Sequence, residues 1–389
     1  MEAMENLDLN ELRNEINEID AQLVPLFLKR MGVSLKVAQY KQANHKPVLD
    51  RTRERELLKR VGGMAEEADL GLYTRLLYAD IMGLSRSYQR KYLENEMSAF
   101  VKKVQNAVQS PKQLDLPEEA IVACQGVEGA YSSLACARLF KRPDILFFDA
   151  WEGVFSAVQQ GLCQYGILPI ENSTAGSVNH VYDLMNQYKF HIVKSVRLKV
   201  EHALLAKKGV QLSEIKEIFS HEQAINQCSL FLNGLSGVKV TVCENTAAAA
   251  KRVAESDRRD IAAISSKDCM ELYGLSALCE NIQNSDSNYT RFICIGKDLE
   301  IFPGACKTSL MLTLPHKPGA LYDVLSRFYA LDINLLKLES RPRPHSDFEF
   351  RFYFDVEASV YSENFLRMLS ELEASTEQFC YLGSYTEIL

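Results

Sequence analysis

The chain has 389 residues, which is more than one hydrophobic core usually serves, so we expect two or three domains. It carries 44 Lys and Arg against 51 Asp and Glu, a net charge of −7, and 47% of its residues are hydrophobic. This composition is typical of a globular protein and excludes disordered and fibrous classes. The acidic balance also argues against binding to nucleic acid or to an anionic membrane surface.

The ten cysteines are scattered without any CxxC pair, and most of them stand inside apolar runs such as "IVACQG". Such thiols are typical of buried, reduced cysteines. The N-terminus is acidic and has no apolar core, and no stretch approaches the roughly 18 apolar residues that a membrane helix needs. We therefore predict a cytoplasmic protein.

The first part of the chain predicts helices only, so residues 1–105 are expected to form an all-α domain. A long helix is expected from Asp8 to about residue 44, with Asp8 and Glu11 as a capping box and Pro25 as a kink. Further helices are expected over residues 50–61 and 70–104. The first helix has a stripe of apolar residues at helical spacing: Leu12, Ile16, Ile19, Leu23, Leu26 and Phe27.

Beyond a polar, proline-containing linker at residues 106–118 the pattern changes. Short β-type runs alternate with helical ones over residues 119–298, which predicts an α/β domain with a parallel or mixed sheet. Residues 305–389 predict the order βαββαβ, a small α+β module with split βαβ topology. The predicted fold class is therefore a multidomain protein with all-α, α/β and α+β parts.

Polar and charged residues in the helical domain form a candidate site for a small dianion. Arg30 and Lys41 are eleven residues apart in the sequence. On one helix they differ by only about 20° around the axis and about 16 Å along it. Arg13 lies about 25 Å from Arg30 along the same helix. Arg13 is therefore either merely solvated or part of a second copy's site. The candidate set is Arg13, Arg30, Lys41, Asp50, Arg53, Glu54, Ser85 and Gln89.

The segments "LRNEINEID", "KRMGVSLKVAQYK", "PVLDRTRERELL" and "SRSYQ" resemble the all-helical class of chorismate mutase. The resemblance implies a rearrangement of chorismate to prephenate that needs no nucleophile, only a held conformation and a stabilised ether oxygen. It implies that Arg30 and a partner chain's Arg13 grip carboxylates, and that Lys41 and Gln89 donate to the ether oxygen. The substrate hydroxyl and the cations would be held by Asp50, Arg53, Glu54 and Ser85.

In the middle domain, the segments "CQGVEGAYSS", "LPIENSTAGSVNHVYDL", "FSHEQAINQCSLFL" and "SNYTRFICIG" place small and hydroxylic residues at strand-to-helix junctions. Unpaired N–H groups at helix N-termini suit carboxylates. The motifs "GVEGAYS", "PIENS" and "TRF" resemble prephenate dehydratase, which implies two lobes around a cleft, similar to a periplasmic binding protein, and no cofactor or metal.

For the dehydration, the resemblance makes Thr290 the best candidate for helping the hydroxyl group of prephenate to leave, as a positioned hydrogen-bond donor. Glu171 is the competing proton source, and it would need a raised pKa. The expected binding residues are Asn172, Ser173, Thr174, Ser220, Gln227 and Arg291.

The segments "LPHKPGALYDVLSRF" and "LLKLESRPRP" resemble the amino-acid-binding ACT module. The resemblance implies a homo-oligomer, at least a dimer, with phenylalanine as a feedback inhibitor at the module. A glycine at the loop-to-helix junction lets a ligand approach the backbone. The candidate effector-binding residues are Gly319, Ala320, Leu321, Asn334, Glu339, Ser340 and Arg341.

Together the three resemblances predict a bifunctional enzyme that converts chorismate to prephenate and prephenate to phenylpyruvate. One alternative is a non-catalytic sensor of aromatic metabolites, against which Lys41, Gln89 and Thr290 argue. A second alternative, prephenate dehydrogenase, requires a nicotinamide site, and the GxGxxG fingerprint of such a site is absent from the sequence.

Overall fold

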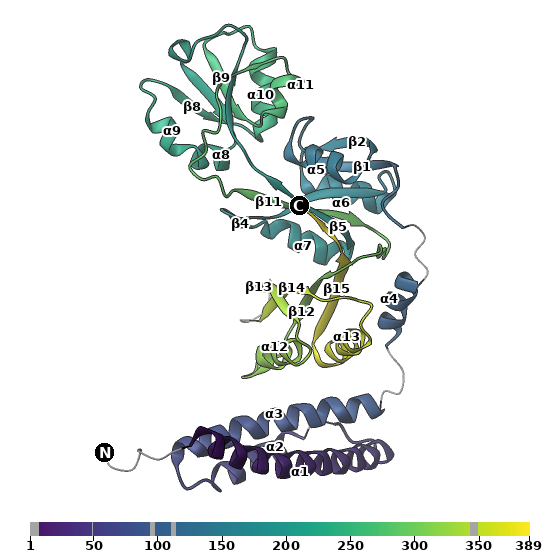
Figure 1. Ribbon diagram of the computed structural model, residues 1–389. Coiled ribbons are helices and arrows are strands. Elements are labelled where there is room, and N and C mark those ends of the chain that lie inside the picture. Colours follow the sequence, from purple (N-terminus) through teal and green to yellow (C-terminus); the bar gives the residue numbers. More distant parts are fainter. Residues whose placement is uncertain (1–7, 49, 94–97, 110–113, 343–348) are drawn as a thin grey trace, which may run out of the picture. The chain divides into compact units, whose positions relative to one another are not determined.

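The computed structural model describes residues 8–48, 50–93, 98–109, 114–342 and 349–389. The chain forms two compact units, one mainly from residues 1–100 and one mainly from residues 101–389. Figure 1 labels the helices and strands of both units. Each unit is described by itself.

The first unit contains three helices, which we call the helical unit: α1 (Leu9–Ala43), α2 (Arg51–Gly62) and α3 (Ala68–Leu93). Asp8 caps α1 by accepting a hydrogen bond from the backbone N–H of Asn10 at 2.8 Å. Asp50 caps α2 in the same way, accepting from the N–H of Arg53 at 3.0 Å. The first two helices therefore begin where a side-chain oxygen satisfies a free N–H. Asp8 was predicted as a cap from the sequence, whereas Asp50 was not. Helix α1 continues through Pro25 as one helix.

The prediction of a single third helix over residues 70–104 is wrong. Helix α3 ends at Leu93, and a separate helix α4 covers Ala99–Gln109. Helix α4 has an apolar side of its own, on which Val101 and Val104 are fully buried. It extends into the region expected to be linker, of which residues 110–113 lie outside the described residues.

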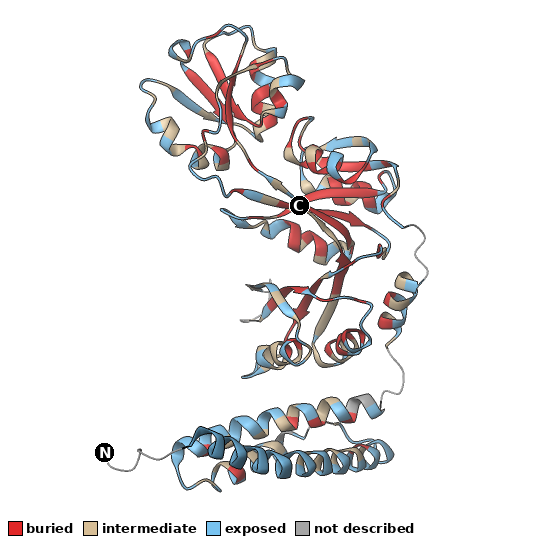
Figure 2. Cartoon of the chain, in the orientation of Figure 1, coloured by how far each residue is buried: buried red, intermediate tan, exposed pale blue. Residues whose placement is uncertain are grey.

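Much of the apolar stripe of α1 is exposed in the single chain. The exposed fractions of Ile16, Leu23 and Leu26 are 57%, 54% and 63%. Figure 2 shows α1 in pale blue along most of its length, whereas the strands of the second unit are largely red. Apolar side chains with helical spacing normally pack against a hydrophobic core. In the single chain these side chains are exposed instead.

The second unit begins with a seven-stranded mixed sheet, which we call the first lobe together with its helices. The strand order is β16-β5-β11-β3-β1-β2, with β4 paired to β3. The pairs β1–β2, β1–β3 and β16–β5 are parallel, while β11 is antiparallel to both neighbours. Its strands are β1 (Glu119–Gln125), β2 (Arg142–Phe148), β3 (Tyr165–Asn172), β4 (Gly176–Ser177), β5 (His191–Lys199), β11 (Tyr289–Gly296) and β16 (Glu387–Ile388).

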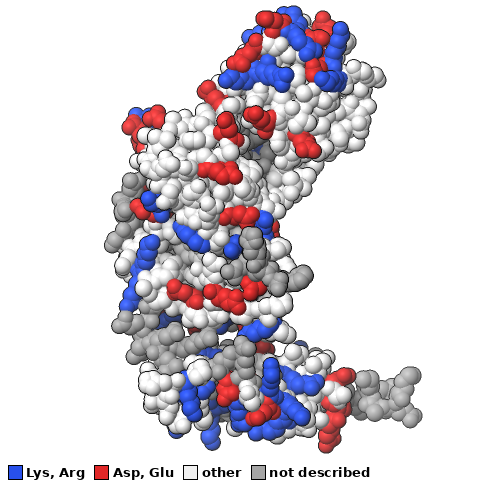
Figure 3. Space-filling view, turned by 180° about the vertical axis from the view of Figure 1, so that it is seen from behind, with Lys and Arg blue, Asp and Glu red and all other residues white. Residues whose placement is uncertain are grey.

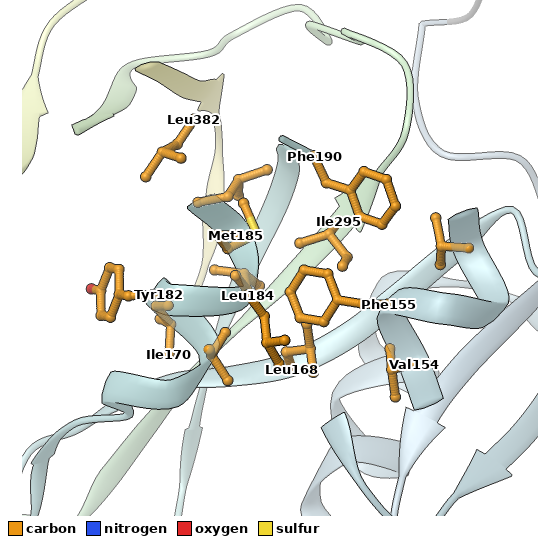
Figure 4. Packing of buried hydrophobic residues seen from close by; sticks show 14 of the residues in the cluster. Val154, Phe155, Leu168, Ile170, Tyr182, Leu184, Met185, Phe190, Ile295 and Leu382 are labelled. Atoms are coloured by element: carbon orange, nitrogen blue, oxygen red, sulfur yellow. The ribbon is translucent and has the colours of Figure 1, made fainter. Parts of the chain in front are cut away.

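Helices cover both faces of this sheet. Cys136 of α5 (Tyr131–Leu139) packs with residues of β1, β3 and β11 on one face. Phe155 of α6 (Trp151–Gln160) and Met185 of α7 (Asn179–Tyr188) belong to the core on the other face. This second core also takes in Met311, Tyr353, Leu382 and Tyr385 from the C-terminal part of the chain. Figure 4 shows Leu382 in the same cluster as Met185 and Phe190.

The chain passes through residues 200–202 into a second lobe and returns through residues 280–288 to β11. The second lobe has a five-stranded sheet in the order β10-β6-β9-β7-β8. Its strands are β6 (Ala203–Ala206), β7 (Glu217–Ser220), β8 (Lys239–Val242), β9 (Ile261–Ser265) and β10 (Ser276–Cys279). Its helices are η1 (Leu212–Glu214), α8 (Glu222–Gln227), α9 (Ser229–Asn233), α10 (Thr246–Glu255) and α11 (Asp268–Leu272). Two α/β lobes joined by two crossings confirm the expected two-lobed domain.

The C-terminal domain has the predicted element order. Its elements are β12 (Lys307–Thr313), α12 (Ala320–Ala330), β13 (Asn334–Pro342), β14 (Phe350–Glu357), α13 (Glu363–Ser375) and β15 (Gln378–Tyr385). The antiparallel sheet has the order β13-β14-β12-β15, so the split βαβ topology is confirmed. The chain then returns to the first lobe, where β16 pairs with β5. The sequence did not predict this two-residue strand.

All ten cysteines are free, and six of them are buried: Cys124, Cys136, Cys163, Cys228, Cys269 and Cys294. Across the described part of the chain, no helix combines the length and apolar character that a bilayer crossing requires. On the face in Figure 3, acidic and basic side chains occur together on the helical unit and on the second lobe.

Candidate active sites

A cleft lies between the two lobes and has a volume of about 220 Å³. The first lobe contributes Tyr131, Trp151, Asn172 and Thr290, among others, and the second lobe contributes residues around α8 and α10. The lining residues include the first residues of α5, α6 and α10. Helix N-termini present unpaired N–H groups and positive potential, so the cleft suits an anion. This arrangement agrees with the expectation drawn from the strand-to-helix junctions.

Thr290 and Asn172 face each other in the cleft on neighbouring strands. They are register partners in β11 and β3, and the amide nitrogen Nδ2 of Asn172 lies 2.9 Å from Oγ1 of Thr290. The orientation of the amide follows from its other partners, because its oxygen Oδ1 accepts from the backbone N–H groups of Thr174 and Ala175 at 3.0 and 2.8 Å. Asn172 therefore donates to Thr290. The hydroxyl hydrogen of Thr290 remains available for a ligand in the cleft.

Glu171 and Arg291 lie outside this cleft, on the opposite face of the sheet. Nη2 of Arg291 lies 3.0 Å from Oε2 of Glu171 and also donates to Asp355 of the C-terminal domain. Both residues line a different cavity, which contains neither Thr290 nor Asn172. The expectations that Arg291 binds substrate beside Thr290, and that Glu171 is an alternative proton source, are therefore corrected by the geometry.

A β-bulge explains the placement of Glu171. The register between β11 and β3 shifts after Arg291, so that Arg291 pairs with Glu171 and Phe292 pairs with Pro169. Ile170 is therefore the extra residue, and it lies in the core on the same face as Glu171. Bulges often re-aim side chains next to active sites. Here the bulge directs Asn172 into the cleft.

Three further predicted binding residues occupy different places. Thr174 lines a second, adjoining cavity. Ser173 lines the cavity of Glu171 and Arg291 instead. Ser220 is fully buried and donates to the carbonyl oxygen of Ile264 at 2.8 Å, so the expectation that it binds substrate is corrected too. The cap of α8 is the next residue, His221, whose ring accepts from the N–H of Gln223.

Gln227 lines the cleft as expected, and a histidine that the sequence did not single out holds it. Nε2 of His202 lies 2.9 Å from Oε1 of Gln227, and His202 is only 2% exposed. Since the amide oxygen only accepts, Nε2 carries the proton. Burial lowers the pKa of His202, and the hydrogen bond to Gln227 opposes that effect. Burial also lowers the pKa of His221, which lines the same cleft. The signal that was available in the sequence was the position of each histidine directly beside a strand end.

In the helical unit, the structure joins part of the predicted set. Nη1 of Arg30 donates to Oγ of Ser85 at 2.7 Å, which brings α1 and α3 together at the candidate site. Gln89 lies one turn after Ser85 and is 7% exposed, and its oxygen Oε1 has no hydrogen-bond partner within the described residues. A buried amide oxygen without a hydrogen-bond partner is uncommon in folded proteins and indicates a place where a ligand can bind.

The remaining residues of the helical set make other contacts, and not all of them lie near Arg30 and Ser85. Lys41 donates to the backbone carbonyl of Val48, which closes the turn between α1 and α2. Asp50 caps α2, and Arg53 forms a 3.8 Å ion pair with Glu56 on the surface. Glu54 pairs with Arg86, a cation that the sequence analysis did not include. Arg13 is exposed on α1.

The predicted effector residues of the C-terminal domain fall into two groups. Gly319 has a φ of +82° at the start of α12, a conformation that favours glycine, and Ala320 and Leu321 open that helix. Asn334 and Ser340 are exposed on β13. Glu339 and Arg341 are half-buried and turn toward the first lobe, where Glu339 accepts from Ser177 and Arg341 lies 3.2 Å from Asp183.

The folds and sites define an enzyme with a cleft between two α/β lobes, joined to a helical unit with a separate site of cations and amides. The family description "Prephenate dehydratase" matches residues 122–300, and "Chorismate mutase type II" matches residues 12–90. The chain belongs to the bifunctional chorismate mutase/prephenate dehydratase family and has both enzyme activities.

Two relatives and one solved structure show the extent of the similarity. The bifunctional chorismate mutase/prephenate dehydratase of Enterobacter agglomerans is 32% identical, covering 96% of this chain and 95% of the relative. Arogenate dehydratase/prephenate dehydratase 2 of Arabidopsis thaliana is 37% identical, covering 68% of this chain and 72% of the relative. The prephenate dehydratase of Arthrobacter aurescens in complex with L-Phe is 27% identical with a TM-score of 0.62, covering 68% of this chain and 89% of that chain.

Proposed function

We propose that the cleft between the lobes binds prephenate and that Thr290 donates the hydrogen bond that helps its hydroxyl group to leave. When the ring carboxylate leaves as CO2, the electrons of the broken C–C bond make the ring aromatic and the C–O bond breaks. The departing hydroxide needs a proton or a hydrogen bond at that moment. The hydrogen bond from Asn172 to Thr290 carries this proposal, because it occupies a lone pair of the hydroxyl and leaves its hydrogen free.

The carboxylates of prephenate are held by uncharged donors in this proposal. The cleft lining includes the starts of α5, α6 and α10 and the amides of Gln223 and Gln227, but none of its residues in the described chain is Lys or Arg. Backbone N–H groups at helix starts bind anions without a positively charged side chain. No metal or organic cofactor takes part in the proposed reaction.

A direct assay tests this function. Full-length protein incubated with chorismate should form prephenate and then phenylpyruvate, and incubation with prephenate alone should form phenylpyruvate. Addition of NAD should leave both rates unchanged. Formation of prephenate without phenylpyruvate would contradict the dehydratase part of the proposal.

For the mutase we propose that two copies of the helical unit pair, and that Arg13 of each copy completes the partner's site. The exposed stripe of α1 supports this, because Ile16, Leu23 and Leu26 are each more than half exposed in the single chain. Chorismate would then lie near Arg30, Ser85 and Gln89. Lys41 and Gln89 would donate to the ether oxygen, and Asp50, Arg53 and Glu54 would orient the substrate and the cations.

We also propose that L-phenylalanine inhibits the dehydratase by binding to the C-terminal domain, as an ACT module, near Gly319. The relative from Arthrobacter aurescens was solved in complex with L-Phe, which supports an effector of this kind. The proposed effector contacts are Gly319 to Leu321 with Asn334 and Ser340. Since Glu339 and Arg341 turn toward the first lobe, we assign them to the contact between the domains instead.

Finally, we propose that the enzyme acts in the cytoplasm as a homo-oligomer. Its ten free cysteines suit a reducing compartment.

A further inference from the structure

We propose that Asp355 of the C-terminal domain is a positioning residue for the dehydratase reaction, acting through Arg291 on the pair formed by Thr290 and Asn172. This inference rests on the role proposed above for Thr290. Asp355 lies outside the cleft but would help to fix the positions of Thr290 and Asn172.

Two pairs of neighbouring residues lie on opposite faces of the sheet. Thr290 and Arg291 are consecutive in β11, and Asn172 and Glu171 are consecutive in β3. The register pairs Thr290 with Asn172 and Arg291 with Glu171. The first pair is hydrogen-bonded at 2.9 Å in the cleft, and the second is an ion pair at 3.0 Å on the opposite face. Each cleft residue is therefore bonded through the backbone to a residue of the ion pair behind it.

The C-terminal domain completes the ion pair of Arg291 and Glu171. Arg291 donates to Oδ2 of Asp355 on β14. The side chains of Arg291 and Asp355 are only 10% and 8% exposed. Lys337 of β13 lies 3.4 Å from Glu171, so two neighbouring strands of the C-terminal sheet, β13 and β14, reach the cluster. A buried, multiply bonded guanidinium has little freedom, because moving it would leave charges unpaired away from water.

The second carboxylate oxygen of Asp355 is also held in place. Its oxygen Oδ1 accepts from Oγ of Ser309, and that hydroxyl lies 2.7 Å from the hydroxyl of Tyr385. Ser309 and Tyr385 are 2% and 1% exposed, and Tyr385 belongs to the core shared by the first lobe and the C-terminal domain. The carboxylate is thus held rigidly by the domain that supplies it, which suits a residue that positions another.

The experiment compares Asp355→Asn with a matched variant in the full-length enzyme. Asp183→Asn removes a different carboxylate between the same two domains, the partner of Arg341 at 3.2 Å. Arg341 pairs with Arg351, which is four residues from Asp355 along β14. We expect Asp355→Asn to lower the dehydratase kcat about 10- to 100-fold with KM changed less than about threefold, since small displacements of a reacting group have effects of this size. Asp183→Asn should keep kcat within about twofold of the unsubstituted enzyme, because a substitution that does not disturb the core or the reacting groups usually has a small effect.

Two measurements separate a positioning role from a loss of folding. Trp151, the one tryptophan of the sequence, lines the cleft, so its fluorescence during thermal unfolding reports whether the first lobe remains folded. If Asp355→Asn unfolds, Ser309→Ala decides the question, because it loosens Asp355 without removing the charge next to Arg291. We expect Ser309→Ala to lower kcat several-fold at an unchanged unfolding temperature.

If Asp355→Asn folds and its kcat is unchanged, the proposal is overturned. If Asp355→Asn unfolds, an unchanged kcat in folded Ser309→Ala overturns it. An equal loss in Asp183→Asn also overturns it, because that result would indicate only that the domains must dock. Thr290→Ala is measured in parallel. If it keeps its dehydratase rate, the role of Thr290 fails; if it loses the rate while the Asp355 and Ser309 variants keep theirs, only the present inference fails.

Discussion

His202 and Gln227 form a hydrogen-bonded pair in which one buried imidazole fixes the orientation of a cleft amide, with 2.9 Å between Nε2 and Oε1. The pair joins the crossing segment between the lobes to the end of α8. The amide group of Gln227 keeps its orientation in the cleft only while His202 donates a hydrogen bond to its oxygen. Protonation of the buried His202 should therefore change the free energy of unfolding of this unit.

We predict that the unit containing the cleft loses stability as the pH falls below about 6.5, the ordinary pKa of histidine in an unfolded chain. Burial lowers the pKa of His202 in the folded state. Between the two pKa values the unfolded chain binds more protons, so the free energy of unfolding decreases as the pH falls. Urea unfolding followed by Trp151 fluorescence should give a lower midpoint at pH 5.5 than at pH 7.5.

The variant His202→Gln should show a smaller difference between these two midpoints than the unsubstituted enzyme. His316→Gln is the matched control, because the side chain of His316 is exposed in the same unit. An equal pH difference in all three proteins would exclude His202 as a source of the effect.

Thr290→Ala should lower the dehydratase kcat about 100- to 1000-fold, the loss typical of one hydrogen bond to a developing charge. Thr290→Ser keeps the hydroxyl group and should remain within about tenfold of the unsubstituted enzyme, since it loses only a methyl contact. Mutase activity of the same preparations is the internal control and should not change. Equal losses in the alanine and serine variants would show that the methyl group, not the hydroxyl, matters.

Arg13→Ala and Lys41→Ala should each abolish mutase activity and spare the dehydratase. If each mutase site takes Arg13 from the partner chain, mixing the two inactive proteins under conditions of subunit exchange should restore about one quarter of the activity, because half of the pairs are mixed and each mixed pair has one intact site. Mixing Arg30→Ala with Lys41→Ala is the control and should restore none, since both residues serve the same chain's site. Recovery in the control, or none in the first mixture, would contradict a shared site.

Gly319→Ala should weaken the inhibition of the dehydratase by phenylalanine at least about tenfold, measured as the ratio of rates with and without the amino acid. A side chain at a φ of +82° is strained by about 1–2 kcal/mol, and at Gly319 it would occupy space that is open in the structure. Gly237→Ala is the matched control, because Gly237 has a φ of +73° in the second lobe, also with open space around it. Its inhibition should be unchanged, and loss of inhibition in both variants would indicate a general effect of strain.

Local features predicted much of the architecture. The capping carboxylate of Asp8 marked the start of α1, and alternating apolar runs marked most strands of the two lobes. The order of elements in the C-terminal domain was correct throughout. These features depend on hydrogen bonds and periodicity within about ten residues, which a sequence displays directly.

Strand β16 and the boundary between α3 and α4 were not predicted. The two residues of β16 form a strand only because β5 offers a free edge to them. No local propensity can report such a partner, because it lies nearly two hundred residues away in the sequence.

The sequence alone determined the number and order of the domains and the residue types of both sites, because these follow from local pattern and motif. The tertiary structure alone decided which residues share a site. In β3 the bulge at Ile170 turns Asn172 into the cleft and leaves Glu171 on the opposite face, where Arg291 and Asp355 meet it. A single extra residue reverses the side on which every later side chain of a strand points, and only the pairing with a neighbouring strand reveals it.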